Sequence, residues 1–153
     1  MTPTTAPRRL APAAAALVAA ATLAACGGGP PGDLFVVTRS GTIPGAKLTL
    51  LFIDDGGVSC NGGPRRDITS EQLIAARELR RELDGDDHDK KARALAKEHL
   101  SLPPGRITTL SYRVRSEEGT VAFSDTSAHQ PQTFYRLAQL TRDVAKGACG
   151  LAR

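Results

Sequence analysis

The chain has 153 residues, and its 20 Lys and Arg against 16 Asp and Glu give a formal net charge of +4. Two of the positive charges, Arg8 and Arg9, lie near the amino terminus, so residues 26–153 carry only about +2. This weak charge excludes a strong polyanion binder, and no nucleic-acid partner is expected. With four Phe, two Tyr and no Trp, any core must be built mainly from Leu, Val, Ile and Ala.

Residues 1–25 have the pattern of an export signal. The first nine residues carry two positive charges and no acid, and an alanine-rich apolar run follows to Leu23. That run is shorter than the roughly 20 apolar residues of a membrane-spanning helix. It ends in the small residues that signal peptidases require. We therefore expect 1–25 to be a cleaved signal peptide, and the sequence leaves open whether export follows the general secretory or the twin-arginine route.

The sequence Leu23-Ala24-Ala25-Cys26 stands directly before Gly27. It resembles the lipobox of bacterial lipoproteins, and the whole chain is similar to small lipoproteins of high-GC Gram-positive bacteria. The resemblance implies that the Cys26 thiol receives a diacylglyceryl group, that the chain is cut before Cys26, and that acyl chains such as palmitate anchor the protein. Two or three acyl chains give a stable anchor, at about 0.8 kcal/mol per buried methylene. The expected location is the cell membrane, lipid-anchored and facing the extracytoplasmic side; a plain secreted protein is the alternative.

A short Gly/Pro tether, 26–33, is expected to separate the anchor from a single α+β domain, 34–153. Fully extended, the tether spans only about 20–25 Å. The β-rich runs 34–38 and 47–53 predict a hairpin with a long loop, and 58–60 predicts a short third strand.

The middle of the chain changes to helical periodicity. Thr69 or Ser70 is expected to cap a helix, because amide and acidic residues follow in its first turn. A second helix is expected over 87–99. Strands are predicted at 107–115 and 120–124, and a last helix opens at Pro131. The expected fold is an antiparallel sheet of four or five strands, made of two hairpins, with helices packed on one face and one disulfide.

The disulfide follows from counting cysteines. If Cys26 is lipidated, Cys60 and Cys149 remain as a pair, and a pair in an exported chain predicts a disulfide. It would close a loop of about 90 residues, worth up to about 4–5 kcal/mol in the chain-entropy model. Two unrelated buried thiols, or half of a metal site, are the alternatives.

The loop 39–45 is the candidate binding site. It is long for a hairpin connection and offers Arg39, Ser40, Thr42, Ile43 and Pro44, with Ile43 expected to be exposed. Loops on rigid hairpins often carry binding functions.

No residues are predicted to be catalytic or to bind a metal, and no cofactor is expected. Acids at 84–89 lack the spacing of a calcium loop, and the three histidines share no ligand spacing. An enzyme of unrecognised type would require a deep pocket around Asp125 and His129. Arginines at 65–66 and at 77–81 suggest an accessory role at cell-wall polymer or lipid, although interleaved acids weaken that idea.

The order hairpin, helix, Leu102-Pro103 break, hairpin, helix is similar to emfourin, a small bacterial inhibitor of thermolysin-type metalloproteases. Arg39-Ser40-Gly41 after the first strand and Tyr112 after the break also look like that family. The resemblance implies protease inhibition, but no inhibitory residue is carried over. The function expected is a membrane-anchored, non-enzymatic binding module with an envelope or secreted protein partner.

Overall fold

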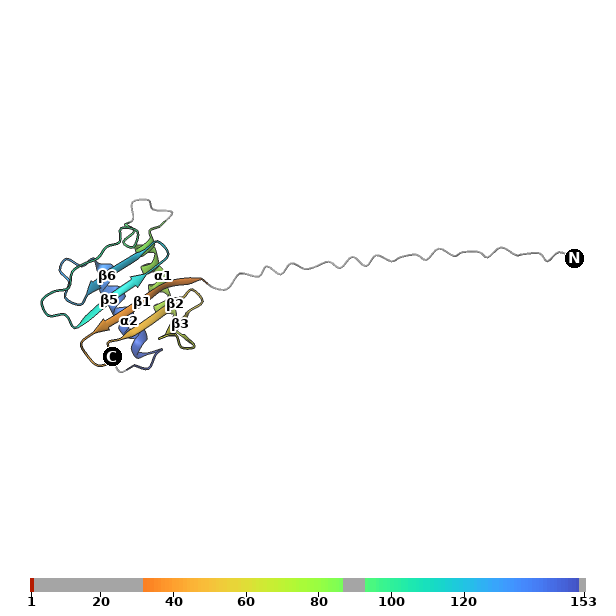
Figure 1. Ribbon diagram of the computed structural model, residues 1–153, viewed down its shortest axis with the longest axis horizontal. Coiled ribbons are helices and arrows are strands. Elements are labelled where there is room, and N and C mark those ends of the chain that lie inside the picture. The colour runs from red at the N-terminus through yellow and green to blue at the C-terminus, as the bar shows by residue number, and fades with distance from the viewer. Residues whose placement is uncertain (2–31, 87–92, 152–153) are drawn as a thin grey trace.

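The computed structural model describes residues 1, 32–86 and 93–151. Within them the chain forms a six-stranded antiparallel sheet and two helices (Figure 1). The elements in chain order are β1 (Asp33–Gly41), β2 (Leu48–Ile53), β3 (Gly57–Cys60), β4 (Arg65–Asp67), α1 (Ser70–Asp84), β5 (Leu110–Arg115), β6 (Thr120–Ser124) and α2 (Gln132–Lys146). The strands lie in the order β4-β3-β2-β1-β5-β6.

The predicted α+β class is confirmed, but the predicted four or five strands were wrong, because the sheet has six. The additional strand is β4, whose three residues are charged and exposed. β4 is defined by its backbone pairing with β3. Its sequence has no alternation of hydrophobic and polar residues by which a strand could be recognised. The Arg65 guanidinium also bridges Asp55 and Asp67, at 2.9 Å and 2.7 Å. Charge at an edge strand protects the sheet from pairing with other chains.

The two halves of the chain meet in the middle of the sheet, where β1 pairs antiparallel with β5. Side chains alternate along β1, so that Phe35, Val37 and Arg39 are buried while Thr38 and Ser40 are exposed. Both helices cover the same face of the sheet (Figure 1). The core lies between that face and the helices, and none of the described helices covers the opposite face of the sheet.

Each helix begins where its local sequence predicts. Thr69 forms a capping box with Gln72, in which the side chain of each accepts from the backbone N–H of the other. Two orphan N–H groups of the first turn of α1 are satisfied in this way. Pro131 stands immediately before α2. The buried residues of the two helices recur at helical spacing: Ala76, Leu79 and Leu83 in α1, and Phe134, Leu137, Thr141, Val144 and Ala145 among those in α2.

The helix predicted over 87–99 is not found in the part of it that is described. Residues 87–92 lie outside the described residues, and 95–99 form a turn. The turn is closed by bonds from the Glu98 N–H to the Ala94 carbonyl and from the His99 N–H to the Ala96 carbonyl. Leu95 and Ala96 are buried, so the apolar positions were predicted correctly although the element was not.

The predicted disulfide is present. Cys60 and Cys149 are joined with a Cα–Cα separation of 5.9 Å and 89 positions apart in the sequence. The bond fastens the chain just beyond α2 to the end of β3. Arg136 of α2 binds Glu78 and Glu82 of α1, and Thr133 donates to Glu82 at 2.7 Å. The two helices are therefore tied to each other by polar contacts, and α2 is tied covalently to the sheet.

The predicted signal peptide, the lipidation site Cys26 and all of the tether before Gly32 lie outside the described residues. Among the helices that the structure describes, none is both long enough and apolar enough to cross a membrane.

Candidate functional site

Two loops meet at the end of the sheet that is farthest from Gly32. β1 (orange) runs from right to left in Figure 1, from Asp33 to Gly41, and β5 begins beside its end at Leu110. The loops 42–46 and 105–109 are joined by a bond of 3.1 Å from the Thr42 N–H to the Thr109 carbonyl. A Cβ at Gly41 would lie only 2.1 Å from that carbonyl oxygen, so the close approach requires glycine there. We call the loops 42–46 and 105–109 together the tip.

The loop 42–46 contains a tight turn. The Ala46 N–H donates to the Ile43 carbonyl at 3.1 Å, and Gly45 has a φ of +76°. Proline at the second position and a glycine of positive φ at the third are the signature of a type II turn. Pro44 and Gly45 therefore fix the shape of the loop from the local sequence.

Arg39 supports this loop through hydrogen bonds to its backbone. Its side chain is buried, with 2% of the residue exposed, and it lies on the core side of β1. Nε donates to the Ala46 carbonyl and a terminal nitrogen donates to the Gly45 carbonyl, both at 3.0 Å. Arg39 is a candidate binding residue of the sequence analysis, but it is buried, and these two hydrogen bonds go to the backbone of its own loop. Its role in the structure is to keep the loop in one conformation.

The other candidate residues of the loop lie at the surface. Ser40, Thr42 and Pro44 are exposed, and Ile43 is 36% exposed. Sequence reasoning missed Ile107 in the second loop of the tip, which is 82% exposed. The strand pattern had assigned Ile107 to β5, although Gly105 two positions earlier was a signal for a loop. The two isoleucines lie on adjacent loops.

A cavity of about 470 Å³ lies between the tip and the second half of α2. Its size is within the range of small-molecule or side-chain binding sites. We call it the tip pocket, and its lining residues are Arg39, Ile43, Pro44, Gly45, Ala46, Leu110, Arg142, Asp143 and Lys146.

The helical side of the tip pocket is positively charged. Arg142 and Lys146 are four positions apart, so they lie on one face of α2, and both are exposed. Asp143 is the one exposed acid in the lining. Among the described residues, no carboxylate lies within ion-pair distance of Arg142 or Lys146. Like charges at this spacing repel each other, so the fold gains no stability from their being together.

Tyr112 lies beneath this region. Its ring stacks on Phe123, which stacks on Phe134, with ring centroids 5.0 Å and 4.3 Å apart. The Tyr112 hydroxyl is buried and has no hydrogen bond of normal geometry among the described residues. Burial raises the pKa of Tyr112, and the nearby positive charges of Arg142 and Arg39 oppose that rise. Both guanidinium groups therefore lie close to this hydroxyl.

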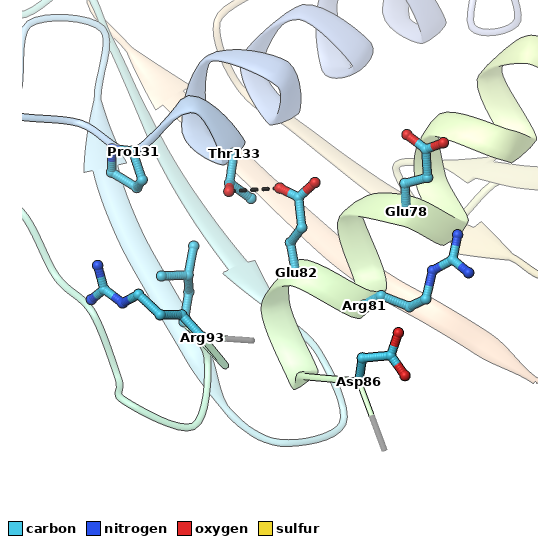
Figure 2. A pocket seen from close by; sticks show the side chains of 8 residues that line it. Glu78, Arg81, Glu82, Asp86, Arg93, Pro131 and Thr133 are labelled. Carbon is cyan, nitrogen blue, oxygen red and sulfur yellow. Dashed lines mark hydrogen bonds between the residues drawn. The ribbon is translucent and has the colours of Figure 1, made fainter. Parts of the chain in front are cut away.

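A second hollow, of about 420 Å³, lies beside the ends of the two helices (Figure 2). Figure 2 shows Glu82 turned toward Thr133, and Glu82 is also bound by Arg136. These polar groups already serve to join α1 to α2. Asp86 and Arg93 of the lining border the segment 87–92, which is not described, so we assign no ligand to this hollow.

An enzyme would require a deep pocket around Asp125 and His129, but neither residue lines the tip pocket or the hollow beside the helix ends. The Asp125 carboxylate accepts from the backbone N–H groups of Thr109 and Leu110 at 3.0–3.2 Å, so it fixes the second loop of the tip. His129 is exposed and has a φ of +55°. In the described ranges, no group of three or more His, Cys, Asp or Glu side chains is placed to hold a metal ion.

Comparisons with protein-family models, with curated proteins and with solved structures find no match to this chain.

Proposed function

We propose that the protein is a non-enzymatic binding module, anchored by lipid at Cys26 on the extracytoplasmic side of the cell membrane, which binds an envelope or secreted protein at its tip. The observation that carries this proposal is the preformed loop 42–46, which borders a cavity of about 470 Å³ and is supported by hydrogen bonds from the buried Arg39. A loop that is already ordered loses little conformational entropy on binding. Ile43 and Ile107 supply exposed apolar surface on the two loops of the tip.

The position of the tip also supports this function. The lipobox lies upstream of Gly32, and β1 carries the chain away from that point for about 25 Å, at roughly 3.3 Å per residue. An anchor at Cys26 would therefore leave the tip at the end of the domain farther from the membrane. That end is accessible to a protein partner.

An accessory role through the surface arginines is less well supported. Three of those arginines are paired within the protein: Arg65 with Asp55 and Asp67, Arg77 with Asp54, and Arg80 with Glu117. Contact with wall polymer or lipid would have to compete with these ion pairs. Protease inhibition of the emfourin type is one form that the binding function could take, and the experiment below identifies the class of the partner.

The test is a cross-linked pull-down from the native envelope with the tagged full-length lipoprotein and an Ile43→Asp variant. The matched control is Ile74→Asp, because Ile74 is an exposed isoleucine (56%) on α1, away from the tip. We expect one stoichiometric protein partner that is lost with Ile43→Asp and kept with Ile74→Asp. The proposed function would be contradicted if both variants lost the partner, if both kept it, or if no partner were captured at all. Arg39→Ala is unsuitable as a probe of binding, because Arg39 supports the loop itself.

A further inference from the structure

We propose that the tip pocket recognises an acidic protein segment, with Arg142 and Lys146 binding its carboxylates and Ile43 contacting a neighbouring apolar side chain. This inference rests on the proposed function and deepens it, because it names the chemistry of the partner. It starts from the charges on α2.

Arg142 and Lys146 stand one helical turn apart on the wall of the tip pocket. The ion pairs of the described residues leave both without a carboxylate, whereas Arg65, Arg77, Arg80, Arg93 and Arg136 each bind at least one. Other described arginines, among them Arg66, Arg113 and Arg115, also have no carboxylate within ion-pair distance, so Arg142 and Lys146 are set apart by their position on the wall of the pocket, which the buried Arg39 also lines. Two exposed positive charges against the single Asp143 favour an anionic occupant.

The interior of the pocket favours a ligand that also has apolar groups. Besides the residues of α2, Ile43, Pro44, Ala46 and Leu110 line it. A free inorganic anion would leave this apolar surface wet, and an uncharged apolar segment would leave the two cations without partners. A segment that alternates carboxylates with apolar side chains would pair with the cations of α2 and also cover the apolar lining.

The geometry favours a protein segment over a lipid surface. The pocket is lined by the loop that follows the end of β1 opposite to Gly32. The same membrane that holds Cys26 would thus meet the other end of the domain. Rigid placement of α2 by the Cys60–Cys149 disulfide also keeps the two cations in register with the loop.

The experiment measures binding of short synthetic peptides to the full-length lipoprotein in detergent by fluorescence anisotropy. One peptide has glutamates interspersed among leucines, and two others have glutamine or lysine in place of each glutamate. The test variant is Arg142→Glu/Lys146→Glu. The matched control is Arg113→Glu/Arg115→Glu, which makes the same charge change on exposed residues of β5.

We expect the glutamate peptide to bind at least about tenfold more tightly than the glutamine peptide, since one ion pair of about 1.4 kcal/mol gives that ratio. Charge reversal at 142 and 146 should remove this preference and favour the lysine peptide, whereas the β5 control should keep the wild-type order. Higher salt should weaken binding of the glutamate peptide.

Equal binding of the three peptides, the same loss in the β5 control, or no binding of the glutamate peptide would overturn the inference. So would binding of phosphatidylglycerol vesicles through Arg142 and Lys146 in place of the peptide. These results are distinguishable from failure of the proposed function, because a partner captured through Ile43 would remain even if the pocket showed no preference for acids.

Discussion

Arg39 illustrates how burial changes the meaning of a candidate residue. In the sequence it is an arginine in a loop and suggests an exposed binding contact. In the structure it is 2% exposed and donates to two carbonyls of the loop that follows it. The cost of burying its charge is offset by hydrogen bonds, and the result is a loop with one conformation.

We therefore expect Arg39→Ala to destabilise the fold. Hydrogen bonds from a charged donor contribute about 1.5–3 kcal/mol each, and removing the side chain also leaves a void, so the free energy of unfolding should fall by about 2–4 kcal/mol. Urea denaturation of the purified full-length protein measures this. Arg113→Ala, an exposed arginine on the uncovered face of the sheet, is the control and should change stability by less than about 0.5 kcal/mol. Equal effects of the two variants would contradict the structural role of Arg39.

Tyr112 gives a prediction that depends on pH. Burial raises its pKa above the ordinary value of 10.0. The chain has two tyrosines and no tryptophan, so Tyr135→Phe leaves Tyr112 as the one tyrosine to be followed by absorbance. Since the folded state holds the proton more tightly than the unfolded state, its contribution to stability is complete below pH 10 and is lost as pH rises through the folded pKa. Titration of Tyr112 at or below 10 in the folded protein would contradict the observed burial.

At the scale of the elements, the capping box of α1 is encoded by four consecutive residues, 69–72, and was predictable. Thr69→Ala should lower the free energy of unfolding by about 1 kcal/mol, because the Gln72 N–H would lose its acceptor. Thr69→Ser keeps that acceptor and is the control. Thermal unfolding followed by circular dichroism compares the two, and an equal loss in both would show that the cap does not stabilise the helix.

The disulfide acts on the last element. Replacing both Cys60 and Cys149 by serine should lower the free energy of unfolding by about 2–4 kcal/mol, because the unfolded chain regains the freedom of a loop of 89 positions. The comparison belongs in a Cys26→Ala background, so that no third thiol exchanges with the pair. Reduction of the parent protein should produce the same loss. A parent unaffected by reductant would argue that the bond contributes nothing.

How much the sequence predicts depends on how local the cause of each element is. The hydrophobic alternation of β5 and β6, the capping box and the cysteine pair all lie in the sequence itself, and each was predicted. β4 was missed because a strand of three charged residues is specified only by its pairing with β3. The turn at 95–99 was mistaken for helix because positions 92, 95 and 96 are apolar and have helical spacing in the sequence, while His99 adopts a φ of +51° that ends the turn.

In the candidate site too, features with a local cause could be predicted and features that depend on long-range packing could not. The exposure of Ile43 followed from Gly, Pro and loop length, but the predicted loop, 39–45, began too early, because β1 continues through Arg39 and Ser40 to Gly41. The tip pocket could not be predicted, because Arg142 and Lys146 meet the loop only through the packing of α2 about 100 positions later. In the sequence those two residues look like an ordinary charged helix end, favoured by the helix dipole.

For the molecule as a whole, Gly32, which follows the proposed anchor in the sequence, and the tip are at opposite ends of β1. This separation matters because the tether is short, at about 20–25 Å when extended, and the domain would therefore stay near the membrane surface. A binding site beside the entry of the chain would be obstructed by the bilayer. With the proposed anchor, a site at the far end of the sheet would be accessible to a partner in either the envelope or the surrounding medium.

The anchor itself is tested by Cys26→Ala. In the proposed anchor the thiol at position 26 accepts the diacylglyceryl group, so the variant should move from the membrane pellet to the soluble fraction, and incorporation of labelled palmitate should be lost. Cys60→Ser/Cys149→Ser is the control, because those sulfurs are joined to each other in the fold and the variant should stay in the pellet. If Cys26→Ala remains in the pellet after mild washing, the lipid anchor is wrong. The orientation argued for the tip then loses its basis, whereas the charge preference of the tip pocket does not depend on it and is measured separately.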